Sequence, residues 1–357
     1  MQEEALTLDD FVRDRWYAAA WSCELASGII LRRKILGKHI VFWRGLGGSI
    51  SALLDYCPHR AARLSDGKIV GDEIECAYHG LRFNGLGKCA RNPHGNRRAD
   101  NIETPSFHII EKHGVLWIWN GRVEEADQHL IPDFFYLEQY DDFVHSQRGY
   151  LYIKANYLLI SDNLLDLSHT QFLHPNLLGS EAIINGDHDV SVHEDKVSVK
   201  IWARNAPAPK AFEVFFPLEG KPVDHWLQID WKAPGYIHLF SGVTSPGETK
   251  ADGWENISAH LITPADKTTS HYFFHSSRDP RSRRLPFDPK TMEEILTVNV
   301  PEWHPFLIED KPMLEAQQGV IDELNLCERD LITLSSDAGP MRARIVIKRL
   351  LHEKSAQ

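Results

Sequence analysis

The sequence predicts an α+β protein with two domains, residues 1–132 and 133–357. Three observations favour this fold class. Short apolar, β-branched segments separated by turn residues fill the first third of the chain, which is typical of antiparallel strands. A polar, acidic segment, Gly121–Pro132, then interrupts the pattern and is interpreted as a linker. A Leu-rich helical segment, a second series of strands and two C-terminal helices follow it.

The first domain is expected to be a small antiparallel β structure. The segment Gly45–Gly48 could cradle a phosphate only if a helix followed it. A strand pattern follows instead, so a hairpin turn is predicted there. The same patterns predict strands at 29–36, 39–43, 50–54, 82–83, 88–89 and 114–120.

Two short segments of this domain concentrate cysteine and histidine. Cys57-Pro58-His59-Arg60 is followed, after a gap of sixteen residues from His59, by Cys76-Ala77-Tyr78-His79-Gly80. Four such ligands could hold a zinc ion. The split of one Cys and one His per loop favours a Rieske [2Fe–2S] centre, in which one iron takes two Cys and the other takes two His. Cys89 is interpreted as a buried structural thiol, because four ligands are already supplied.

These motifs resemble the cluster motif of the Rieske non-haem iron oxygenases. By that resemblance Cys57, His59, Cys76 and His79 hold the [2Fe–2S] cluster. Respiratory Rieske proteins carry an extra Cys in each loop, whereas Ala62 and Tyr78 stand at the matching places here. A low-potential cluster of the oxygenase kind is therefore expected.

A second group of chemistry-bearing residues lies in Asp162–Pro175. On a continuous helix Asp162, Asp166 and His169 would share one face, with Asn163 one turn before Asp166. Pro175 disfavours helix at His174, so the helix is predicted to end there and the two His to converge. Burying such polar groups unpaired would be costly, which indicates pairing or a bound metal.

This segment resembles the mononuclear iron motif of the same family, in particular its vanillate and dicamba O-demethylase branch. The resemblance implies Fe(II) held by His169, His174 and a carboxylate, a triad that leaves positions open for O₂. Asp310 matches the family's carboxylate, and Glu309 is the adjacent alternative. It also implies that Asp166, with Asn163 beside it, is catalytic: Asp166 would bridge His169 to His79 of a neighbouring subunit, in a head-to-tail homotrimer.

The remainder of the second domain predicts a curved antiparallel sheet followed by helices, which matches the family's helix-grip catalytic domain, similar to the START and Bet v 1 folds. Strands are expected at 190–202, 226–233, 237–243, 256–263 and 269–275, and helices at 311–326 and 341–352. Substrate contacts are expected from this sheet and the helix facing it, although core packing explains each candidate equally well. The candidates are Ile160, Leu165, Leu239, Phe240, His260, Phe274 and Trp303. Leu239 stands where the dicamba branch offers a polar contact, so the substrate anchor is expected to differ.

Bulk properties exclude several classes of protein. A net charge of -11 argues against nucleic acid as the main partner, and the local basic stretch 278–284 is interpreted as a solvated loop. No signal peptide and no apolar run of about 20 residues is evident, so no membrane association is expected. An odd count of 5 cysteines does not suit a disulfide framework and indicates a reducing cytoplasm.

The chain has no dinucleotide-binding signature, so electrons from NADH must come from a separate reductase, directly or through a ferredoxin. The predicted function is a Rieske monooxygenase that oxidises an aromatic substrate, with O- or N-dealkylation as its outcome. Ring dihydroxylation or hydroxylation by the same machinery is one alternative. A Rieske electron carrier is another, but that needs only about 100 residues.

Overall fold

The computed structural model describes residues 11–95, 101–138, 144–146, 148–175, 178–210, 212, 218, 220–278 and 305–353. The chain divides into two compact units. The first comprises Met1–Asp133 with Thr263–Lys267, and the second Phe134–Ile262 with Thr268–Gln357. The predicted linker contains two single 3₁₀ turns, Val123–Glu125 and Gln128–Leu130.

The first unit is built from small antiparallel sheets, as predicted. The prediction that Gly45–Gly48 forms a hairpin turn is confirmed, because β3 pairs with β4 across it and Gly48 has a φ of 87°. The strands of the two sheets that form its body are β1 (Arg15–Trp21), β10 (Val115–Asn120) and β9 (Ile109–Lys112), and β2 (Ile30–Ile35), β3 (Lys38–Arg44) and β4 (Ile50–Leu54).

A third sheet of short strands carries the second Cys/His segment. Its order is β5 (Lys68–Val70), β6 (Glu73–Glu75), β7 (Arg82–Phe83) and β8 (Cys89–Arg91). Cys76 follows β6 directly, and Cys57 follows β4 after a short turn. Both thiols lie in one buried cluster with Trp43, Leu53 and Phe83. The two Cys/His segments are therefore anchored to a single apolar core.

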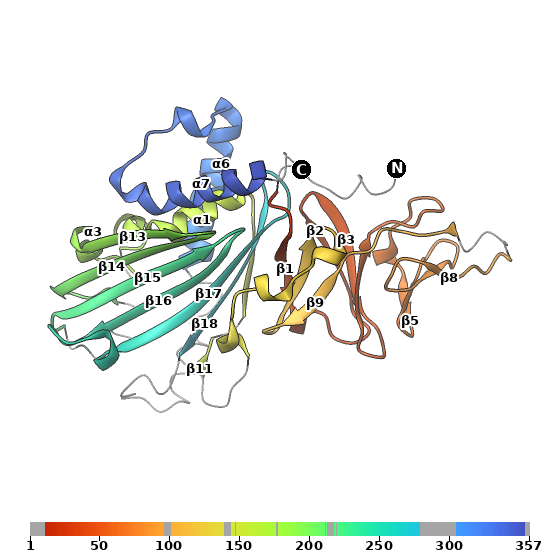
Figure 1. The fold of residues 1–357 in the computed structure, drawn as a ribbon, viewed down its shortest axis with the longest axis horizontal. Helices are drawn as coiled ribbons and strands as arrows, with labels where there is room; N and C mark the ends of the chain where they lie inside the picture. Colours follow the sequence, from red (N-terminus) through yellow and green to blue (C-terminus); the bar gives the residue numbers. More distant parts are fainter. Residues whose placement is uncertain are drawn as a thin grey trace. The chain divides into compact units, whose positions relative to one another are not determined.

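The second unit contains an eight-stranded antiparallel sheet. Figure 1 shows helices α1, α6 and α7 on one face of this sheet. The strands are β11 (Val144–His145), β12 (Gly149–Ile153), β13 (Asp187–His193), β14 (Lys196–Ala206), β15 (Val223–Lys232), β16 (Tyr236–Thr244), β17 (Trp254–Pro264) and β18 (Ser270–Arg278).

The prediction of a single strand over 190–202 is wrong. The chain reverses at Glu194 and Asp195, and β13 pairs antiparallel with β14 from His193 and Lys196 outward. Glu194 adopts a φ of 54°, which the turn requires. Glycine and asparagine are the residues that usually adopt this conformation in a hairpin turn, and neither occurs at positions 194 and 195.

The helices are α1 (Tyr157–Leu165), α2 (Thr170–Leu173), α3 (Glu181–Asn185), α6 (Lys311–Leu324) and α7 (Ala338–Glu353). Single 3₁₀ turns occur at Ser22–Glu24, Leu64–Asp66, Phe135–Leu137, Leu167–His169, Lys250–Asp252, Glu328–Asp330 and Ser335–Asp337. None of the described helices combines the length and apolar character that crossing a membrane requires.

Helix α7 packs directly on the sheet. A Cβ atom added at Gly339 would overlap the side chain of Val199 in β14, so only glycine allows this approach. Val199 is opposite Ile229, and Ile229 is opposite Leu239. Side chains directly opposite each other lie on the same face of a sheet. This row of residues therefore identifies the face of the sheet that the helices cover.

Candidate metal centres

The two Cys/His segments of the first unit share one backbone design. Cys57 N–H donates to the carbonyl of Ala62 and Ala61 N–H to that of Cys57, at 2.7 and 2.9 Å. In the second loop, Cys76 N–H donates to Leu81 and Gly80 N–H to Cys76, at 2.8 and 3.0 Å.

Ala61 and Gly80 take the left-handed conformation at equivalent places, with φ of 54° and 72°. The two loops therefore have the same backbone conformation, although their sequences differ. Their imidazoles also meet: the ring centroids of His59 and His79 are 4.5 Å apart.

The side chains of these two loops are suited to binding an iron–sulfur cluster. Cys57 and Cys76 are each 2% exposed. Burial, and then the adjacent Cys76 thiol, raise the pKa of Cys57 to about 11, so two thiolates would not be stable together here without a cation. Among the described residues, the buried Nδ1 of His79 has no hydrogen-bond partner. A buried ring nitrogen without a hydrogen-bond partner, on a ring that contacts His59, is a group that metal ligation would satisfy.

In the second unit, the prediction of one helix running to His174 with Asp162, Asp166 and His169 on one face is wrong. Helix α1 ends at Leu165, and Asp166 is extended with φ of −118° and ψ of 92°. Its carboxylate accepts a hydrogen bond from Ser168 N–H and so caps the following turn. A side chain that competes for backbone donors in this way ends helices rather than continuing them.

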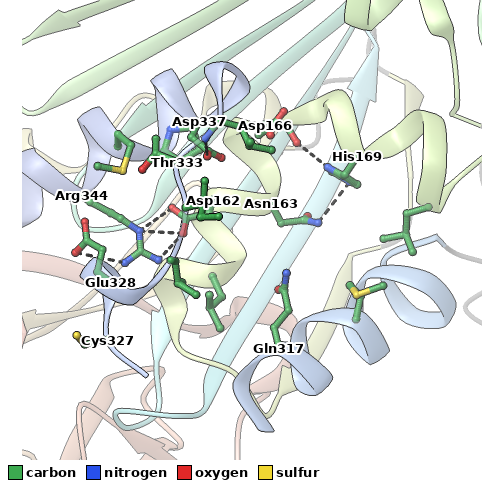
Figure 2. Close-up of a pocket in the computed structure, with 18 of the residues that line it drawn as sticks. Asp162, Asn163, Asp166, His169, Gln317, Cys327, Glu328, Thr333, Asp337 and Arg344 are labelled. Carbon is green, nitrogen blue, oxygen red and sulfur yellow. Dashed lines mark hydrogen bonds and ion pairs between the residues drawn. The ribbon is translucent and has the colours of Figure 1, made fainter. Parts of the chain in front are cut away.

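The break separates the roles of the acidic residues. Asp162 points away from the histidines and pairs with Arg344 of α7, whose Nε lies 3.0 Å from Asp162 Oδ2 (Figure 2). Arg344, for which the sequence carries no signal, also approaches Glu328. Asp162 therefore holds α1 to α7.

The break also brings three predicted ligands together. Single ligand atoms of His169, His174 and Asp310 all lie within 4.8 Å of one another. Asp310 Oδ1 is 3.1 Å from His174 Nε2 and 3.5 Å from His169 Nε2. Asp310 is 4% exposed and His174 is 1% exposed. Two imidazoles and one carboxylate facing a common point fit the triad of a mononuclear non-haem iron.

The distal nitrogen of each imidazole is anchored. His169 Nδ1 donates to the backbone carbonyl of Asp166 at 2.6 Å, and His174 Nδ1 donates to Glu309 Oε2 at 2.6 Å. Both rings therefore direct Nε2 toward Asp310. The amide of Asn163 completes the set, donating to Asp310 Oδ1 at 3.0 Å and lying 3.4 Å from His169 Nε2.

Contacts within the triad shift the pKa values of Asp310 and His174 in opposite directions. Burial disfavours a charged Asp310, but hydrogen bonds from His169 and His174 outweigh it and hold the pKa of this carboxyl well below its usual range. Burial likewise disfavours protonation of His174, yet Asp310 and Glu309 raise its pKa overall. A carboxylate is thus kept ionised where a cation would need it.

An open groove of about 1120 Å³ runs beside this site in the second unit. Figure 2 shows its polar wall, where Asn163 and Gln317 point toward each other and Asp166 lies next to His169. The apolar wall includes Met313, Leu331, Ile332 and Leu334, which are 45%, 50%, 87% and 65% exposed. None of the described residues that were expected to contact substrate lines this groove.

Most of those substrate candidates lie on the helix-covered face of the sheet or on α1. Ile160 and Leu165 are each 1% exposed, and Leu239 is half-buried opposite Ile229. His260 has both ring nitrogens engaged, one by Tyr272 Oη at 2.7 Å and the other by Ser258 Oγ at 2.9 Å.

Phe240 does not share a face with Leu239, because side chains alternate along a strand. Its ring lies 5.3 Å from Lys250 Nζ, on the other side of the sheet, so grouping Phe240 with His260 is wrong. Phe274 does lie with the His260 group, its centroid 5.2 Å from that of Tyr272. Trp303 is outside the described residues, as is the basic stretch beyond Arg278. Cys89 is half-buried rather than fully buried.

Comparisons with known proteins agree with this geometry. Residues 15–108 match the Rieske [2Fe-2S] domain, and residues 153–353 match the vanillate O-demethylase oxygenase C-terminal domain. The chain is 34% identical to the oxygenase component of chloroacetanilide N-alkylformylase from Rhizorhabdus wittichii, over 96% of this chain and 95% of that protein. It is 35% identical to the oxygenase component of dicamba O-demethylase from Stenotrophomonas maltophilia, over 75% and 79% of the two chains.

Among solved structures, dicamba monooxygenase bound to 3,6-dichlorosalicylic acid superposes with a TM-score of 0.87 at 31% identity, covering 97% of this chain and 99% of that one. The fold and the two sites define a Rieske non-haem iron oxygenase, and the chain belongs to the vanillate O-demethylase branch of that family. It is the oxygenase component of a monooxygenase system with a separate reductase, and its cofactors are a [2Fe–2S] cluster and a mononuclear iron.

Proposed function

We propose that this oxygenase dealkylates an aromatic substrate that carries an O- or N-linked alkyl group. The proposal rests on the triad of His169, His174 and Asp310, in a chain whose relatives are named dicamba O-demethylase and chloroacetanilide N-alkylformylase. Bound iron supplies the site at which O₂ is reduced with two electrons and two protons. One oxygen atom enters a C–H bond next to the heteroatom and the other leaves as water, after which the hemiacetal or hemiaminal releases an aldehyde.

In this proposal the two units divide the work, with residues 1–132 holding the cluster and 133–357 holding the iron. Cys57 and Cys76 ligate one cluster iron, and His59 and His79 ligate the other. The buried, unpaired Nδ1 of His79 supports its assignment as a ligand atom. Asp310 is assigned as the carboxylate of the mononuclear site, because its oxygen approaches the Nε2 atoms of both histidines.

Asn163 and Asp166 are assigned to the catalytic machinery beside the iron. The amide of Asn163 hydrogen-bonds Asp310 and orients the carboxylate. Asp166 positions His169 through its backbone carbonyl, while its half-buried carboxylate lines the open groove. That carboxylate is available to a donor from another chain.

The donor that we assign to Asp166 is His79 of a second copy, in a head-to-tail homotrimer. An apolar wall of exposed side chains on the groove is a surface that association would bury. Asp166 and Asp337 line the groove, whereas Arg60 and Arg63 are exposed on and beside the first Cys/His loop. The two surfaces are therefore complementary in charge. A carboxylate between two imidazoles fixes their orientation and gives the electron a short hydrogen-bonded route.

Electrons reach the cluster from a separate reductase, directly or through a ferredoxin. The substrate is a small aromatic molecule placed over the iron from the helix-covered face of the sheet, with Ile160, Leu165 and Leu239 offering apolar contact. Leu239 cannot hydrogen-bond, so a polar substituent of the substrate must find its partner elsewhere. Closing such a pocket against water protects the oxidation step.

The test is a screen of aryl methyl ethers and N-alkyl anilides with a reductase and NADH, measuring O₂ uptake and aldehyde together. Stoichiometric aldehyde release supports dealkylation. Formation of a cis-diol or a ring-hydroxylated product without aldehyde would instead assign the alternative oxygenation. About two irons per chain, rather than about three, would assign an electron carrier.

A further inference from the structure

We propose that Glu309 is a positioning residue of the mononuclear iron site: its carboxylate holds the distal nitrogen of His174 and strengthens that imidazole as an iron donor. This inference rests on the proposed iron site. It assigns to Glu309 a function that differs from ligation. The proposal rests on one observation: the carboxylates of Glu309 and Asp310 contact the two nitrogens of the buried His174 ring.

The backbone explains how neighbouring residues can do this. In an α-helix successive side chains point about 100° apart, so adjacent carboxylates normally diverge. Phe306–Asp310 instead form one turn of π-helix, a rare geometry that is frequent at functional sites. Phe306 fixes this turn against the sheet, its ring centroid 5.7 Å from His260 and 5.2 Å from Phe274. From this turn both carboxylates reach His174, Glu309 at Nδ1 and Asp310 at Nε2.

The two carboxylates are not equivalent. The side chain of Asp310 is 6% exposed and faces the Nε2 atoms of both histidines. The side chain of Glu309 is 30% exposed and reaches the far side of the ring, with Oε2 at 2.6 Å from Nδ1. A carboxylate can only accept at this position, so the Nδ1 proton of His174 belongs to the bond with Glu309. Nε2 is then the atom left for the metal.

The two imidazoles of the triad are consequently anchored by groups of different charge. His169 donates its Nδ1 proton to the neutral carbonyl of Asp166, whereas His174 donates to a carboxylate. A carboxylate partner raises the basicity of a ligating imidazole more than a carbonyl does, and losing such a partner costs about 10–100-fold in metal affinity. His174 is therefore the stronger donor of the pair.

The experiment uses the full chain with its cluster and compares Glu309→Ala, Glu309→Gln and the control Glu323→Gln. Glu323 is an exposed residue of helix α6. Fe(II) affinity is measured by competition with a chelator. The second readout is the electron paramagnetic resonance signal of the ferrous site with nitric oxide as probe, recorded with the cluster oxidised. The visible spectrum of the cluster reports whether the rest of the protein is intact.

We expect Glu309→Ala to bind Fe(II) about 10–100-fold more weakly and to alter the nitric oxide signal. Glu309→Gln, which keeps an acceptor oxygen but no charge, should recover part of the affinity, and Glu323→Gln should match the wild type. A wild-type affinity and signal for Glu309→Ala would overturn the inference. So would loss of iron in Glu309→Ala together with retention in Asp310→Ala, because Glu309 would then be the ligand.

The same measurements distinguish an error in the proposed iron site from an error in the role of Glu309. If the wild-type chain and Glu323→Gln bind no iron beyond the cluster, the mononuclear site itself is wrong and the inference falls with it. If both bind this iron and the Glu309 variants do so equally well, only the role of Glu309 is wrong.

Discussion

Replacing Asp166 with asparagine tests the proposed electron route between subunits with little effect on the rest of the site. The residue acts through two separate groups. Its backbone carbonyl holds His169 Nδ1 at 2.6 Å, and its carboxylate accepts from Ser168 N–H at 3.0 Å. Asparagine keeps the carbonyl, and its side-chain oxygen caps a turn as well as aspartate does. The iron site and the local fold should therefore survive Asp166→Asn.

Under the proposed bridge, Asp166→Asn loses only the charged hydrogen bond between the Asp166 carboxylate and a histidine of another chain. Hydrogen bonds to charged groups contribute about 1.5–3 kcal/mol. If this energy is lost along the route of the electron, turnover should fall by about 10- to 150-fold, since each 1.36 kcal/mol is tenfold in rate. Metal content should not change. Asp252→Asn, at a capping carboxylate outside the groove, is the matched control and should keep its activity.

The assay is a single turnover with substrate: the reduced cluster is mixed with O₂, and its reoxidation is followed by absorbance. Turnover of Asp166→Asn within about threefold of wild type would refute the bridging role. Complementation adds a second criterion. In mixed oligomers of Asp166→Asn and His79→Ala chains, one junction pairs an intact Asp166 with an intact His79. Recovery of activity on mixing is expected only if the electron crosses between chains.

Three further outcomes are expected. Asp310→Ala should lower iron content from about three to about two per chain and leave the visible cluster spectrum intact; unchanged iron would contradict its assignment as ligand. Burial lowers the pKa of His225 from 6.5 to about 4, so the unfolded chain takes up a proton that the folded chain cannot. Stability should therefore fall by about 2 kcal/mol between pH 8 and pH 5, and urea titrations of His225→Leu should lack this component; an equal slope in both proteins would refute it. Arg344→Met leaves Asp162 without its partner and should cost about 1–3 kcal/mol in thermal unfolding, with the cluster spectrum unchanged; an unaltered transition would show that the pair contributes nothing.

The parts of this protein that local chemistry specifies were predictable. The Cys/His loops are short, and each places its ligands within a few residues, so spacing alone indicates a [2Fe–2S] centre. The five-residue separation of His169 and His174 is similarly local. The strands β15 to β18 follow from runs of apolar and β-branched residues between turn signals, because a half-buried strand has a period of two.

Other features depended on competition between local preference and packing. The Leu-rich pattern predicts a helix through Asp166, but the carboxylate of Asp166 caps a new turn and ends α1. The reversal at Glu194 has no glycine or asparagine to announce it. Phe240 looks like a pocket residue until the register places it opposite Gln228, on the face away from Leu239. Consecutive residues of a strand face opposite sides of the sheet, and only the packing of the helices shows which side is covered.

The sequence by itself determined the kind of cofactors and the class of enzyme, because most of the ligands occur in short segments with specific spacings. It left open how the two adjacent acids lie around the histidines, where the groove lies and what orients the histidines. Those points were decided by tertiary structure alone, since Glu309 and Asp310 are 135 and 136 residues from His174 along the chain. The folded chain brings both to the same ring, where each carboxylate contacts a different nitrogen.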